Sequence, residues 1–184
     1  MKYYLIIIGL VLSTTLSSQN EADLSFEQLL ESAHAYFSEP LESFFKKVRT
    51  TENSVIQFDH ALRAKKDPVD IRYKILPLDD SNLEGFAPQI KISSIAIHMA
   101  SNDVIESDMV FHQLDEASLK PYNADFGLTV FFQPKDRISF KTHCKATFLF
   151  AEGKGIICTF LFFDKTDIDL KLYEHNLGFI AGEL

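Results

Sequence analysis

The sequence HCKATFLFAEGKGIICTFLFF, residues 143–163, is the most strongly patterned part of this chain. Two runs of apolar, aromatic and β-branched residues flank the turn-forming residues Glu152–Gly155. Short hydrophobic runs separated by glycines are typical of a β-hairpin. The second run is apolar on both of its faces, which predicts a central strand in a sheet that is covered on two sides. We therefore expect an α+β fold, with an antiparallel β-sheet flanked by helices as an α/β/α sandwich.

Both cysteines of the chain lie in this hairpin, and its geometry keeps them apart. A turn centred on residues 153–154 places Cys144 opposite Phe163. The same register places Cys158 opposite Leu149. The two cysteines are then offset by about 16 Å along the strands, whereas a disulfide needs Cα atoms within about 7 Å. We expect two buried free thiols, which pack as small apolar side chains.

Length and composition indicate one ordinary globular domain with an acidic surface. The chain has 184 residues, within the size of a single domain of about 100–200 residues. Phenylalanine supplies most of the aromatic volume of the core, because the chain has 17 Phe and no Trp. The formal net charge is −8. This charge opposes binding to nucleic acid or anionic membranes, since both need clustered Lys and Arg.

Residues 1–18 have the organisation of a secretory signal peptide. Lys2 forms the positive region, residues 3–12 the apolar region, and residues 13–18 a small, polar cleavage region. Cleavage after either of the last two serines fits. The apolar run is shorter than the roughly 20 residues that span a bilayer, so we expect no membrane segment in the mature protein. We predict a single soluble α+β domain over 19–184, exported and either periplasmic or secreted.

The first hundred residues predict three helices and one clear strand. The pattern S-x-x-Q at Ser25–Gln28 is a capping box, and apolar residues at helical spacing extend the predicted helix over 26–37. A second helical pattern covers 40–49. Apolar and charged residues alternate over 69–75, which predicts a strand whose charged face points to solvent or lies at a sheet edge. Residues 89–99 combine β-branched residues with a helical stripe, and we favour a helix.

The remaining segments are shorter. Residues 55–58 are β-prone, and residues 60–66 fit either a loop or a continuing strand. We expect a loop over 79–88, a short helix over 110–114 and a strand over 128–132. The pattern after the hairpin becomes helical, and a closing helix would contain Ile168, Leu172 and His175.

Three segments of residues 123–180 share their order with a known superfamily. They are Asn123–Gly127 entering a strand, the turn Glu152–Gly155, and Leu161–Asp164 before a closing helix. In this respect the chain resembles the PsbP-like superfamily of α/β/α sandwiches, which includes the Ran-release-factor proteins. The resemblance implies an antiparallel sheet flanked by helices, and known members are mostly non-catalytic binding or assembly factors. None of their partner-binding residues matches a residue here, so the resemblance implies no site.

The sequence assigns no catalytic, cofactor-binding or metal-binding residue. The six histidines form no H-x-H or H-E-x-x-H pattern; they are His34, His60, His98, His112, His143 and His175. His143 and Cys144 are neighbours on a predicted strand and point to opposite faces, so they do not form a nucleophile–base pair.

Two acidic clusters have structural explanations. A calcium loop needs more oxygen ligands than either cluster offers. The first, at Asp164, Asp167 and Asp169, fits a strand end and a helix N-terminus, where Asp is favoured. The second, at Asp103, Glu106 and Asp108, fits a solvated loop.

These features favour an exported, soluble, non-catalytic protein of the cell envelope that binds a protein partner or an apolar small molecule. The many phenylalanines would line a cavity between sheet and helix or else form a packed core. The alternative function is a small exported hydrolase, whose site of histidine and carboxylates would be assembled by the fold and leave little trace in the sequence. We expect the functional residues in the acidic loops and in residues 79–125.

Overall fold

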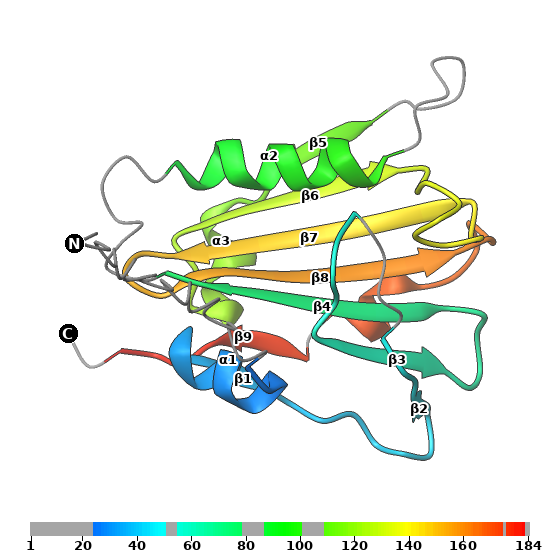
Figure 1. Cartoon of the computed structure of the whole chain (residues 1–184), viewed down its shortest axis with the longest axis horizontal. Helices are drawn as coiled ribbons and strands as arrows, with labels where there is room; N and C mark the ends of the chain where they lie inside the picture. The colour runs from blue at the N-terminus through cyan, green and yellow to red at the C-terminus, as the bar shows by residue number, and fades with distance from the viewer. Residues whose placement is uncertain (1–23, 51–54, 79–86, 101–108, 175, 183–184) are drawn as a thin grey trace, which may run out of the picture.

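A seven-stranded antiparallel sheet forms the centre of the computed structural model (Figure 1). The structure describes residues 24–50, 55–78, 87–100, 109–174 and 176–182. The strands of the large sheet are β2 Phe45–Lys47, β3 His60–Ala64, β4 Asp70–Pro77, β5 Val110–Gln113, β6 Phe126–Phe132, β7 His143–Ala151 and β8 Gly155–Phe163. Their spatial order is β2-β3-β4-β8-β7-β6-β5. A separate antiparallel pair consists of β1 Ala35–Phe37 and β9 Leu177–Phe179.

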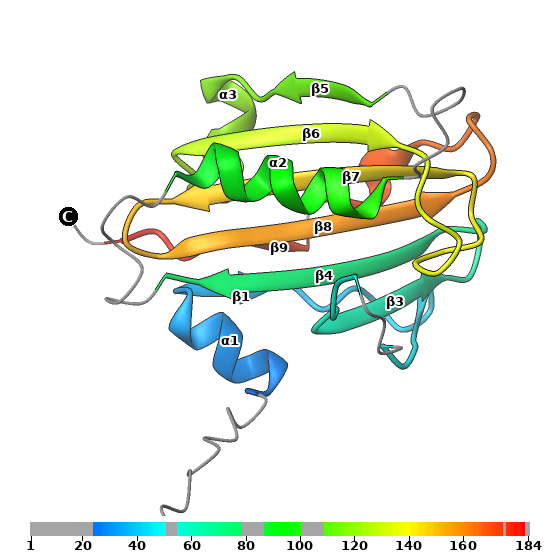
Figure 2. The same ribbon diagram turned by 45° about the horizontal axis from the view of Figure 1, so that its top comes forward.

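Helices and the small sheet flank the two faces of the large sheet, as the sequence predicts for an α+β fold. The helical elements are α1 Phe26–Ser32, α2 Pro88–Met99, α3 Glu116–Leu119 and the 3-10 helices η2 Lys120–Tyr122 and η3 Leu170–Tyr173. One face packs against α2, which runs along the sheet over β7 (Figure 2). The other face packs against α1, η3 and the β1–β9 pair. In the described residues no helix is long and apolar enough to cross a membrane.

Strand β8 is buried along its whole length, which confirms the predicted central strand. Its side chains alternate between two cores. Phe160 and Phe162 lie in the core beneath α2, whereas Leu161 and Phe163 lie in the core beneath the small sheet. Each fully buried side chain of this size contributes about 1.5–3 kcal/mol. Strand β8 therefore contributes side chains to both cores, the one beneath α2 and the one beneath the small sheet.

The hairpin of β7 and β8 is confirmed, but the predicted register is wrong by one residue. Cys144 faces Phe162, and Cys158 faces Phe148. The loop contains three residues rather than two, because Gly153 and Gly155 both take positive φ angles of 70° and 124°. Both cysteines are buried free thiols, as predicted.

Several predicted helices are wrong. The capping box at Ser25 and Gln28 is present, but α1 ends at Ser32 and the chain turns through His34, whose φ is 44°, into β1. The segments predicted as helices over 40–49 and 110–114 contain β2 and β5 instead. Both are short strands whose pairing with β3 and β6 overrides local helical spacing.

Four further predictions concern shorter or neighbouring segments of the chain. The helix predicted over 89–99 is confirmed as α2, and residues 60–64 form the strand β3. The closing helix is only the single turn η3, after which the chain enters β9. Residues 55–58 form no strand and pack as a loop.

The strand predicted over 69–75 is confirmed as β4, but it lies between β3 and β8 rather than at an edge. Its charged face is partly buried. The Arg72 guanidinium lies over the Phe58 and Phe162 rings, at 5.1 and 4.8 Å from their centroids, and donates to the Ile138 carbonyl at 2.7 Å. Such cation–π contacts let a charged side chain cover an apolar surface.

Some predictions lie outside the described residues. They concern the signal peptide over 1–18, residues 79–86, the acidic cluster Asp103, Glu106 and Asp108, and His175.

Candidate binding site

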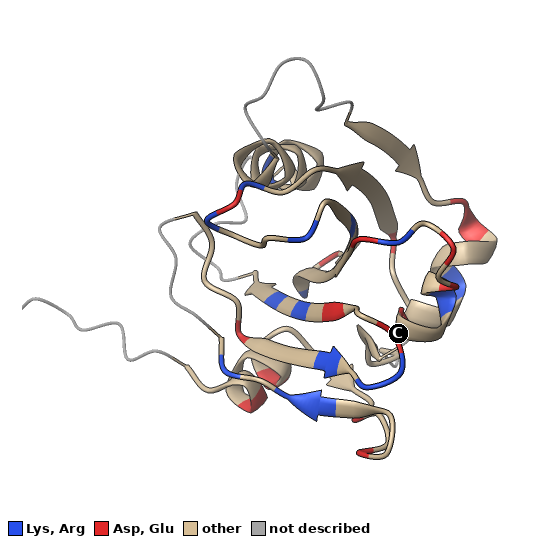
Figure 3. Ribbon diagram, turned by 90° about the vertical axis from the view of Figure 1, so that its right-hand side faces the viewer, with Lys and Arg blue, Asp and Glu red and all other residues tan. Residues whose placement is uncertain are grey.

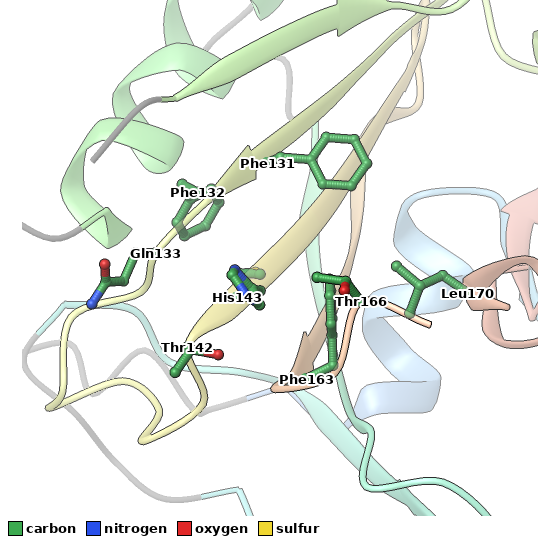
Figure 4. Close-up of a pocket in the computed structure, with 9 residues that line it drawn as sticks. Phe131, Phe132, Gln133, Thr142, His143, Phe163, Thr166 and Leu170 are labelled. Carbon is green, nitrogen blue, oxygen red and sulfur yellow. The ribbon is translucent and has the colours of Figure 1, made fainter. Parts of the chain in front are cut away.

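An open hollow of about 660 Å³ lies where β6 and β8 end and β7 begins (Figure 4). We call it the aromatic hollow. It is lined by Phe131, Phe132, Gln133, Thr142, His143, Cys144, Phe163, Thr166 and Leu170. Its volume lies within the range of about 300–1,000 Å³ that is usual for small-molecule sites.

The sheet register places an aromatic floor in this hollow. His143 faces Phe163 across β7 and β8, and Phe131 faces Lys145 across β6 and β7. Because successive side chains of a strand point to opposite faces, all four side chains project from the same face. The His143 and Phe163 ring centroids are 5.5 Å apart. Phe131 is 39% exposed, so its ring faces the open side of the hollow.

A compensated ion pair stands beside the floor. The Lys145 ammonium lies 5.6 Å from the Phe131 ring centroid and pairs with the Glu174 carboxylate. Both side chains are largely buried. The pair leaves no net charge next to Phe131, so the floor is suited to an uncharged aromatic or apolar group.

The rim of the hollow comes from the segment that follows β8. Thr166 and Leu170 face the floor from this segment (Figure 4). The first turn of η3 is capped by Asp169, whose carboxylate accepts from the Lys171 amide at 3.2 Å. At the other side of the rim, Asp164 accepts from the Lys141 ammonium at 2.8 Å and from the Thr142 amide at 3.1 Å.

In the acidic cluster of Asp164, Asp167 and Asp169, both Asp164 and Asp169 therefore have structural hydrogen-bond partners. The hydrogen bond from Lys141 lowers the pKa of Asp164, so this carboxylate stays ionised in its ion pair. Asp169 acts as a helix cap. Among the described residues no three His, Cys, Asp or Glu side chains gather as a metal-binding group.

The hollow contains a thiol that is not chemically accessible. Cys144 is fully buried, and desolvation raises its pKa well above the usual value. Its sulfur therefore stays protonated and packs in the core beneath α2. His143 lies on the opposite face of β7, as the alternation along the strand predicts.

The described histidines are dispersed over the fold. His34 follows α1, His60 lies in β3, His98 in α2, His112 in β5 and His143 in β7. Each has its own surroundings. His98 Nδ1 lies 2.6 Å from the Ser94 carbonyl oxygen. The His60 ring stacks on Phe26 with centroids 4.6 Å apart, and its buried Nε2 has no hydrogen-bond partner among the described residues. In the described part of the chain none of them bonds a carboxylate, and the hydrolase alternative stays a prediction.

The sequence pattern did not identify the residues of the hollow. Phe131 is part of a predicted strand, and His143 belongs to no metal-binding or nucleophile–base pattern. A usable signal is present, since the run Val130-Phe131-Phe132 puts an aromatic residue on each face at the end of a strand. The partners of Phe131 became clear only from the register of β6, β7 and β8.

No family model, curated protein or solved structure matches the chain. The resemblance of residues 123–180 to the PsbP-like superfamily therefore stays a prediction.

Proposed function

We propose that this chain is an exported, non-catalytic binding protein whose aromatic hollow holds an uncharged, apolar small molecule. The observation that carries the proposal is the floor of Phe131, His143 and Phe163, which faces an open volume of about 660 Å³. Apolar pockets with a few polar groups are the usual form of small-molecule sites.

The proposal places the ligand away from the core between sheet and helix. The Phe148, Phe160 and Phe162 rings are fully buried there and pack against one another or against Phe58. These rings fill the space in which the sequence predicted either a cavity or a packed core. The hollow, by contrast, has exposed aromatic surface at the end of the sheet.

The chemistry of the hollow favours a flat ring over a charged group. Aromatic rings attract other rings in edge-to-face or offset geometry. The Lys145 ammonium is already paired with Glu174, so it offers little to an anion. Thr142, Thr166 and Gln133 supply polar groups at the rim that can orient one polar atom of the ligand.

Titration with the neutral fluorescent dye phenylnaphthylamine tests this proposal on the purified chain. We expect saturable binding, weakened about ten-fold or more by Phe131→Ser and by Leu170→Ser, because each change removes part of the apolar contact. The matched control is Ile97→Ser, which changes an exposed apolar residue of α2 that does not line the hollow. Equal binding by all four proteins, or no saturable binding, would refute the proposal.

A further inference from the structure

The two edges of the large sheet differ in their protection. The edge strand β2 has the sequence FKK, and its two lysines discourage pairing with another strand. The opposite edge strand, β5, has the sequence VFHQ, in which every residue is exposed and none is Lys, Arg, Asp, Glu or Pro. Figure 3 shows β5 without charged residues and the acidic residues that begin α3 just beyond it. Among the described residues, β5 therefore lacks charged side chains and proline, two of the usual devices that block strand addition.

In the part of the chain that the structure describes, no strand pairs with the outer side of the β5 backbone. The Leu114 amide donates to the Gly127 carbonyl of β6 at 3.0 Å. In an antiparallel ladder the residues that bond a given neighbour alternate along the strand. The amide and carbonyl groups of Phe111 and Gln113 consequently point away from β6, toward the position of a further strand.

Exposed apolar side chains flank this edge on both faces. Val110 is 55% exposed and lies opposite Phe131 on β6, on the face that carries the aromatic hollow. Phe111 is 45% exposed and projects from the other face. A strand placed beside β5 would cover both side chains with its own alternating residues.

A groove of about 1110 Å³, lined by both apolar and charged residues, continues from the C-terminal end of β5. Its charged lining consists of four acidic and two basic residues, namely Asp115, Glu116, Asp125, Glu152, Lys120 and Lys154. Lys154 is already held by the Ile180 carbonyl, which accepts from its ammonium. The groove thus presents excess negative charge where a strand antiparallel to β5 would begin.

We propose that β5 binds an extended segment of a partner protein, which adds to the large sheet as an eighth, antiparallel strand. The segment has apolar residues at alternate positions, which cover Val110 and Phe111. Lys or Arg residues precede it and enter the acidic groove. This surface is separate from the proposed small-molecule function and does not depend on it. A second copy of the chain fits less well, because both copies carry a net charge of −8 and repel each other.

Selection from a phage-displayed library of random short peptides on the immobilised full chain tests the proposal. We expect enrichment of peptides with basic residues followed by alternating apolar residues. Synthetic copies of the enriched peptides should bind the Phe111→Pro variant of the chain at least about ten-fold more weakly than the natural chain. This substitution removes one outward amide of β5 and leaves the hydrogen bonds to β6 intact. Phe111→Thr, which keeps that amide, should lose less.

A second measurement uses the natural chain and needs no variant. N-methylation of one alternate set of peptide residues should abolish binding, and N-methylation of the other set should preserve it, because only one set faces β5. The proposal is wrong if no peptide is enriched, if Phe111→Pro binds as the natural chain does, or if both methylated peptides bind equally. It is also wrong if sedimentation shows a dimer that Phe111→Pro dissociates, since β5 would then bind a second copy.

Discussion

Replacing Phe160 by Ala tests the packing of β8 in the core beneath α2. The Phe160 ring is fully buried and lies edge-on to Phe58 and Phe148, with centroids 5.4 and 5.6 Å apart. Removing a ring from such a site forfeits its burial and leaves a cavity, so we expect a loss of about 3–5 kcal/mol in the free energy of unfolding. That is a large part of the total stability of a domain, which is typically about 5–15 kcal/mol.

Urea unfolding monitored by circular dichroism measures this loss, with the denaturant slope checked for constancy between proteins. The matched control is Phe140→Ala, because the Phe140 side chain is 92% exposed. The same substitution there should change the free energy of unfolding by no more than about 0.5 kcal/mol. If the two variants lose similar stability, or if Phe160→Ala loses less than about 1 kcal/mol, the account of β8 as a strand packed tightly into the core beneath α2 is refuted.

Three further predictions concern the imidazole in β3, the hairpin turn and the thiols. Burial lowers the pKa of His60, so the unfolded chain binds a proton more readily than the folded chain does. The free energy of unfolding, measured by urea titration, should therefore fall as the pH drops below about 6.5. The variant His60→Phe should show a weaker dependence on pH. Gly155→Ala should lower the free energy of unfolding by about 1–3 kcal/mol in thermal unfolding, because φ is 124° and a Cβ would lie 2.3 Å from a β4 carbonyl oxygen. Gly153→Ala should lower it by less, because a Cβ there would meet no atom within 4 Å. Because burial raises the pKa of both Cys144 and Cys158, they should react with a thiol reagent only after denaturation; rapid labelling of the folded chain would contradict this.

The sequence was informative wherever a segment carries its environment in its own pattern. The run from Gly155 to Phe163 contains no charged residue and is apolar on both faces apart from Thr159, and this pattern requires cover on both faces. The capping box at Ser25 and Gln28 likewise marks the start of α1 through local hydrogen bonds. Both features depend on residues close together in the chain, so both could be predicted.

Long-range pairing explains most of the errors. The strands β2 and β5 have three and four residues, too few to show alternation, and each forms because β3 or β6 offers a ladder. The solvent-facing or edge position predicted for the charged residues of β4 is wrong for a related reason. The Arg72 guanidinium lies over the Phe58 and Phe162 rings, and the Lys74 ammonium forms an ion pair with Asp59 at 2.8 Å. These contacts allow charged residues on an inner strand.

The candidate site could not be predicted for the same reason. Phe131 and His143 belong to neighbouring strands, and Leu170 reaches the hollow from the segment after β8. A shift of one residue in register would turn Phe131 to the opposite face of the sheet. The predicted register of the β7–β8 hairpin was wrong by that amount, so the sequence alone could not have brought these residues together.

Two-dimensional NMR of the natural chain, titrated with phenylnaphthylamine, tests the proposed binding site most directly. We expect the largest chemical-shift changes at the His143 and Phe131 ring signals and at Leu170, with little change at Ile90 and Ile97 on the exposed side of α2. Saturation at one molecule of dye per chain would support the aromatic hollow as the ligand site. Changes confined to α2, or no change at His143 at saturating dye, would contradict it.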